Sequence, residues 1–162
     1  MDRRVFLFTA WFVTGCASRD LPGAAERSGR LVLTRESPRQ RTLLDMPATA
    51  RYCERDSSLS IVAVSDDFSG ALSMRSTWPV AATTRFIIAS PLGDAGSGAA
   101  AARPLVDTSE TDFLGKAGTI TVEPGAFLAG TVEAEMSDST GLTRLSGRFE
   151  GLVVRTGAGA CP

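Results

Sequence analysis

The side chains that perform acid–base or nucleophilic chemistry in most enzymes are scarce in this sequence. Histidine, the usual general base near neutral pH and the commonest metal ligand, is absent from all 162 residues. Serine nucleophiles therefore lack a histidine base, and the Ser-x-x-Lys alternative fails because Phe113 stands three residues before Lys116. The glycine-rich segment 93–98 is not followed by Lys-Ser or Lys-Thr, so it does not match a phosphate-binding loop. We expect no catalytic residue and no cofactor.

Carboxylates are the remaining candidates for chemistry. Asp107, Glu110 and Asp112 lie close together in the chain, and Asp66 and Asp67 occupy an expected turn. Their spacing does not match an EF-hand calcium loop, so we expect solvated loops and no metal site. A hydrolase that uses only two carboxylates, about 5–10 Å apart in a cleft, is kept as one alternative because sequence does not report that separation.

Three aromatic residues could form a surface platform for a sugar or a peptide: Trp78, Phe68 and Tyr52. Trp78 follows an expected strand and precedes Pro79, which also suits a position at the end of a sheet. We favour packing against the core over a surface platform.

Cys16 directly follows the most apolar segment near the N-terminus. Arg3 and Arg4 precede nine uncharged residues, 5–13 (VFLFTAWFV), and Gly15 then precedes the cysteine. A membrane-spanning helix needs about 20 apolar residues, whereas the apolar region of a signal peptide has about 7–15. The segment has the length of a signal peptide.

Residues 1–16 resemble a bacterial lipoprotein signal. Val13, Thr14, Gly15 and Cys16 fit the four lipobox positions in order, although Thr is less usual than Ser or Ala at the second position. The resemblance implies cleavage before Cys16, a thioether-linked diacylglycerol on its sulfur and acylation of its new amine. Ala17, in place of Asp, favours the outer membrane in the sorting scheme of enteric bacteria. The alternative is an apolar first strand or helix with Cys16 as a buried thiol.

If Cys16 carries lipid, Cys53 and Cys161 remain as an even pair in an oxidising compartment. We expect them to form a disulfide that closes a loop of about a hundred residues. The alternative is a redox or metal pair of the CxxC type, but neither the spacing nor a partner ligand supports it.

The chain divides into three parts on this reading. Residues 1–15 are a cleaved signal peptide, 16–48 are the lipid anchor and tether, with a first strand or more tether at 30–35, and 49–162 are a disulfide-closed β domain. The formal net charge of −1 provides no basic patch for a nucleic-acid partner.

Apolar residues alternate with polar ones in most of the C-terminal domain. The alternation predicts strands at 59–65, 70–76, 85–90, 118–123, 127–136 and 142–156, separated by turn residues. Residues 36–47 are expected to form a loop, and 96–104 a loop or one helical turn. The pattern predicts an all-β fold, either an antiparallel β-sandwich or a small β-barrel of about seven to nine strands, with a meander in its C-terminal half.

Gly147 and Gly151 interrupt the last predicted strand, and we expect them to let it coil around the core rather than contact a ligand. The segment from GTITVEPGAFLAGTVEAEM to GLTRLSGRFEGLVV resembles the C-terminal meander of uncharacterised exported bacterial proteins. That resemblance implies no activity.

The sequence therefore predicts a lipid-anchored protein of the bacterial cell envelope, with a non-catalytic binding or structural domain in the periplasm or on the cell surface. Its expected partners are the membrane, through Cys16, and an envelope protein or a small ligand. A second alternative, besides the carboxylate hydrolase, is a lipocalin-like carrier. Small residues such as Gly130 and Ala134 would leave room for its cavity.

Overall fold

Ten strands and no helix make up the part of the chain that the structure describes. The computed structural model describes residues 29–37, 40–89, 95–105, 113–138 and 141–157. The strands are β1 (Gly29–Glu36), β2 (Arg41–Cys53), β3 (Ser58–Val64), β4 (Phe68–Arg75), β5 (Thr84–Ile88), β6 (Ser97–Pro104), β7 (Phe113–Glu123), β8 (Leu128–Asp138), β9 (Gly141–Leu152) and β10 (Val154–Gly157).

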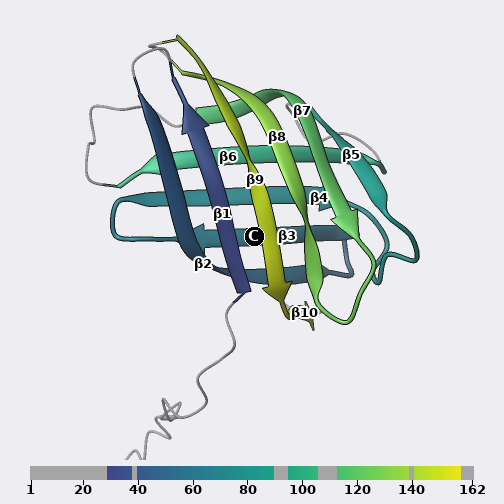
Figure 1. Cartoon of the computed structure of the whole chain (residues 1–162). Helices are drawn as coiled ribbons and strands as arrows, with labels where there is room; N and C mark the ends of the chain where they lie inside the picture. Colours follow the sequence, from purple (N-terminus) through teal and green to yellow (C-terminus); the bar gives the residue numbers. More distant parts are fainter. Residues whose placement is uncertain (1–28, 38–39, 90–94, 106–112, 139–140, 158–162) are drawn as a thin grey trace, which may run out of the picture.

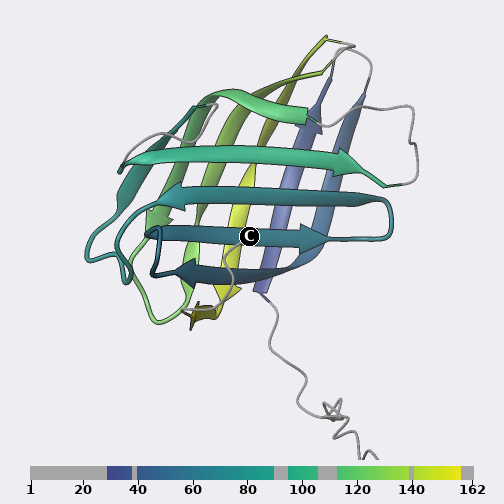
Figure 2. The same cartoon turned by 180° about the vertical axis from the view of Figure 1, so that it is seen from behind.

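The strands pair into one closed sheet. The order β1-β9-β8-β7-β5-β6-β4-β3-β2, together with a β1–β2 pairing, makes a nine-stranded barrel. Most neighbours are antiparallel, but β5 is parallel to β6 and β10 is parallel to β2. Figures 1 and 2 show two layers whose strands cross steeply, with β1, β9 and β8 in one layer and β3, β4 and β6 in the other. The prediction of an all-β fold of the small-barrel type is confirmed, and so is the C-terminal meander of β7, β8 and β9.

Every second side chain points into the barrel and forms its core. In β4 the buried and partly exposed positions alternate along all eight residues. The large side chains that are less than 2% exposed come from both layers: Phe86, Phe149, Leu31, Leu33, Met46, Leu59, Ile61, Leu72, Met74, Ile120 and Leu128. Burial of these groups is the main stabilising term of the fold.

The prediction of a loop over 36–47 was wrong, because most of that segment belongs to β2. Pro47 argued against a strand, since proline cannot donate to a sheet ladder. In the structure Pro47 lies opposite Arg30 of β1, and pairing with β3 begins only at the next residue, Ala48. Pro47 therefore lies just outside the β2–β3 ladder, where its missing N–H is tolerated.

The prediction of a loop or helical turn over 96–104 was also wrong, because Ser97–Pro104 form β6. Residues 99–102 are all alanine, so hydrophobicity does not alternate along them. Burial does alternate, with Ala100 and Ala102 both 4% exposed and their neighbours more accessible. Pairing with β4 and β7 supplies the strand signal that the sequence lacks.

The described part of the barrel begins at Gly29, so the boundary predicted at residue 49 falls inside β2. The optional strand at 30–35 is confirmed as β1, which pairs with both β2 and β9. The predicted signal peptide and residues 16–28 of the predicted tether lie outside the described residues.

The strand predicted over 142–156 divides at Val153 into β9 and β10. After Leu152 the chain passes the start of β1, where a Cβ on Gly29 would lie only 2.7 Å from the Leu152 backbone nitrogen. Gly151 adopts a φ of +69°, which other residues rarely adopt. This crossing brings β10 alongside β2, where Gly157 pairs with Cys53.

Candidate functional site

The structure describes one of the three predicted cysteine sites. Cys53 is 2% exposed at the end of β2. Cys16 and Cys161 lie outside the described residues, so lipidation and the disulfide remain predictions.

The carboxylate candidates are not gathered around a metal site in the described part of the chain. Asp66 and Asp67 are exposed between β3 and β4. Asp107, Glu110 and Asp112 lie outside the described residues. Among the residues that are described, no group of three or more His, Cys, Asp or Glu side chains could hold a metal ion.

The three aromatic residues pack inward and do not form a surface platform. Tyr52 and Phe68 are 8% and 4% exposed. Trp78 is half-buried and packs against the core. The expectation that these residues pack against the core is confirmed.

The large side chains in the described part of the barrel interior are closely packed. A carrier of a small ligand needs a cavity of about 300 Å³ or more, and the side chains around such a cavity would keep accessible surface. Eleven large core side chains instead have less than 2% of their surface exposed. The ring of Phe149 occupies the space beside Gly130, where a Cβ would lie 2.6 Å from Phe149 Cζ. A Cβ on Gly147 would lie 2.1 Å from the carbonyl oxygen of Val32. These glycines allow close packing and leave no room for a ligand beside them.

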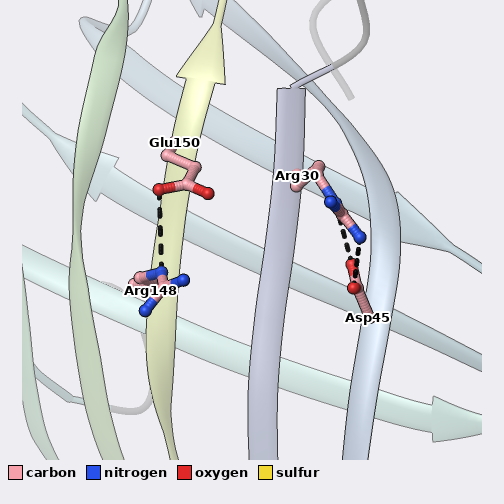
Figure 3. A network of polar contacts seen from close by, with 4 residues as sticks. All are labelled: Arg30, Asp45, Arg148 and Glu150. Carbon is pink, nitrogen blue, oxygen red and sulfur yellow. Dashed lines mark hydrogen bonds and ion pairs between the residues drawn. The ribbon is translucent and has the colours of Figure 1, made fainter.

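Charged side chains cover the outer surface of β1, β8, β9 and the first half of β2, which we call the charged face. Its members are Arg30, Glu36, Arg41, Asp45, Glu133, Glu135, Arg144, Arg148 and Glu150. Arg30 Nε donates to Asp45 Oδ1 at 3.0 Å across β1 and β2, and Arg148 Nε lies 3.6 Å from Glu150 Oε2 along β9 (Figure 3). These side chains are 43–65% exposed, so each pair contributes at most about 1 kcal/mol. The charged face is a solvated surface.

Three carboxylates line one hollow of about 550 Å³ on the charged face: Glu36, Glu133 and Glu135. A catalytic general acid needs a carboxyl group that is shielded from water. The side chains of Glu36 and Glu135 are 45% and 47% exposed, and they pair with Arg41 at 3.2 Å and Arg144 at 3.7 Å. This arrangement favours ion pairing in solvent over a hydrolytic pair.

The outer surface of the second layer, which contains β3, β4 and β6, carries no charged side chain between its margins. We call this surface the uncharged face. It consists of Ser60, Val62, Val64, Ser69, Ala71, Ser73, Ala99, Ala101 and Leu114. One row crosses four strands in register, from Val62 through Ala71 and Ala101 to Leu114. Val62 and Leu114 are 45% and 47% exposed on either side of the smaller alanines. These four residues are part of the lining of a shallow hollow of about 150 Å³, and Arg103 at the margin of the face lines it as well.

Sequence reasoning missed the uncharged face, although the sequence carries a signal for it. Residues 57–65, 68–74 and 95–102 contain no charged side chain, neither at inward-facing nor at outward-facing positions. A half-exposed strand normally places charged or strongly polar groups on its outer side. Their absence from three segments becomes informative only once these segments are known to be neighbours.

No protein-family model, curated protein or solved structure matches this chain. Within the described residues, no helix has the length and apolarity required to cross a membrane.

Proposed function

We propose that this chain is a lipoprotein of the bacterial cell envelope whose barrel is a non-catalytic domain that binds a partner protein through the uncharged face. The observation that carries this proposal is the contrast between the two layers. Both outer surfaces meet water, yet charged side chains cover one of them and stand only at the margins of the other, where Arg51 lies opposite Ser60 and Arg103 opposite Ser69. An apolar surface patch with a polar margin is typical of an interaction site.

The filled core supports an outer binding surface over a lipocalin-like cavity. The lack of histidine and the exposed, arginine-paired carboxylates support a role without catalysis. A protein partner with its own small apolar surface would match the alanine row between Val62 and Leu114.

The proposed location rests on the order of residues before Cys16. Two or three acyl chains would hold the protein firmly, because each buried methylene contributes about 0.8 kcal/mol. Ala17 supports the outer membrane as the destination, with the barrel in the periplasm or on the cell surface.

We also propose a disulfide between Cys53 and Cys161. The β10–β2 pairing supports it, because Gly157 lies opposite Cys53 and precedes Cys161 by four residues. Four residues span about 14 Å at most, so Cys161 stays within reach of β2 although about a hundred residues separate it from Cys53 in the chain.

Cys16→Ser should abolish lipid attachment, because the diacylglycerol is bonded to sulfur. Metabolic labelling with a radioactive fatty acid in a bacterial host measures this directly. The wild-type chain and a Cys53→Ala control should both be labelled, and Cys16→Ser should not. Label in the Cys16→Ser chain, or none in the wild type, would refute the anchor.

A photo-crosslinking amino acid at position 101 should capture a discrete partner in intact cells. The matched control is position 131, which faces outward in the middle of β8, opposite Arg148 on the charged face. We expect one defined adduct from position 101 and none from position 131. Equal adduct patterns, or none from either position, would contradict the proposed binding surface.

A further inference from the structure

Exposed apolar residues gather at the end of the barrel where the described chain begins. The start of β1, the turn between β7 and β8, and β10 lie at this same end in both views (Figures 1 and 2). Residues 124–127 of the turn are Pro-Gly-Ala-Phe, and all four are exposed. Phe127 is 51% exposed and Val153, between β9 and β10, is 50% exposed.

Phe127 and Val153 each adjoin one residue of the same strand pair. Leu128 of β8 pairs with Leu152 of β9, and these two side chains are 1% and 0% exposed because they point into the core. Side-chain direction alternates along a strand. Phe127, just before Leu128, and Val153, just after Leu152, are instead exposed, and we call these two residues the apolar pair.

The chain reaches the barrel directly beside this pair. A Cβ on Gly29 would lie 2.7 Å from the backbone nitrogen of Leu152, the residue before Val153. Twelve residues, 17–28, separate Cys16 from Gly29. They span about 40 Å at most, whatever their conformation, so a lipid on Cys16 keeps this end of the barrel within about 40 Å of the membrane.

We propose that Phe127 and Val153 dock the barrel onto the bilayer that holds the lipid of Cys16, with the Pro-Gly-Ala-Phe turn at the level of the lipid headgroups. This proposal rests on the lipid anchor proposed above. It orients the barrel end-on, so that the uncharged face stands beside the membrane and remains open to a partner.

A bilayer suits this apolar pair better than a protein partner does. A stable protein interface buries more than about 1,000 Å², which two neighbouring side chains do not provide. A tethered domain needs much less, because a short linker keeps its effective concentration near the surface in the millimolar range. Apolar side chains of surface-bound proteins enter the headgroup boundary by about 5–10 Å, a depth that an exposed phenylalanine can reach.

Tryptophan scanning of the lipidated mature protein in phosphatidylcholine vesicles tests the docking. Phe127→Trp and Val153→Trp place a reporter at the proposed contact, and either variant suffices if the other folds poorly. Leu142→Trp is the matched control, because Leu142 is 58% exposed near the β8–β9 hairpin at the opposite end of the barrel. The natural Trp78 provides the common background signal.

Vesicles made with lipids brominated near the headgroup should quench about half of the added emission of Phe127→Trp, since quenching requires a depth close to the bromines. Leu142→Trp should lose no more than the parent chain. Equal quenching of all variants, or no quenching of Phe127→Trp and Val153→Trp, would overturn the docking. Flotation of the same samples with the vesicles tests the anchor separately: protein that floats without quenching retains its anchor and lacks the docking, whereas protein that does not float refutes the anchor itself.

Discussion

Replacing Gly147 with alanine should lower the free energy of unfolding by about 3 kcal/mol, the upper range for adding a methyl group to a packed core. Gly147 lies in β9 where β1 approaches closely. A Cβ there would meet the carbonyl oxygen of Val32 at 2.1 Å and the Cα of Leu33 at 2.9 Å. Both are backbone atoms, so no rotamer change relieves the overlap. The β1–β9 ladder would have to separate.

Gly70→Ala is the matched control, because Gly70 is also an inward-facing glycine inside a strand. A Cβ at Gly70 would lie 3.7 Å or more from its nearest neighbours, the side chains of Leu31, Met46 and Leu33. We expect Gly70→Ala to be neutral or to stabilise by about 0.5 kcal/mol, since alanine restricts the unfolded chain. Urea denaturation measures both variants. If Gly147→Ala were as stable as Gly70→Ala, the close approach of β1 and β9 would be disproved.

Removing the proposed disulfide should cost about 4 kcal/mol of unfolding free energy, because a closed loop of about a hundred residues strongly restricts the unfolded chain. The variant is Cys53→Ala with Cys161→Ala. Alanine is chosen because Cys53 is 2% exposed, and serine would bury a hydroxyl group. The denaturant dependence of unfolding should also steepen, because the unfolded state without the crosslink exposes more surface.

A reducing agent separates the crosslink from side-chain packing in this experiment. Dithiothreitol should destabilise the wild-type chain nearly to the level of the double variant and should leave the double variant unchanged. Wild-type stability that does not respond to reductant, or two free thiols in mass spectrometry of the oxidised protein, would exclude the bond.

Much of the strand pattern was predictable because the strands concerned have one buried side. In β3, Leu59 and Ile61 alternate with serine and valine, and in β8 Val132 is flanked by Thr131 and Glu133. Such alternation records burial directly in residue type. β2 and β6 were not predicted, for two different reasons. Pro47 is of a residue type that usually interrupts a strand, and the alanine run of β6 is equally apolar on both sides.

The candidate surfaces were much less predictable than the strands. Val62 and Leu114 are about fifty residues apart in the chain, and they share a surface only because β4 and β6 lie between them in register. Phe127 and Val153 likewise come to the same end of the barrel through the pairing of Leu128 in β8 with Leu152 in β9. Pairing between distant strands is a tertiary property that no local pattern encodes.

The sequence by itself determined the all-β class, because a strand with one buried side repeats its burial pattern every second residue. It also determined the chemistry that we expect of Cys16 and left serine nucleophiles without a histidine base. Only the tertiary structure decided that the sheet closes into a barrel and that the large side chains in its described interior are buried. It alone also sorted the outward side chains into one charged and one uncharged face, because which outward residues become neighbours depends on strand order and register.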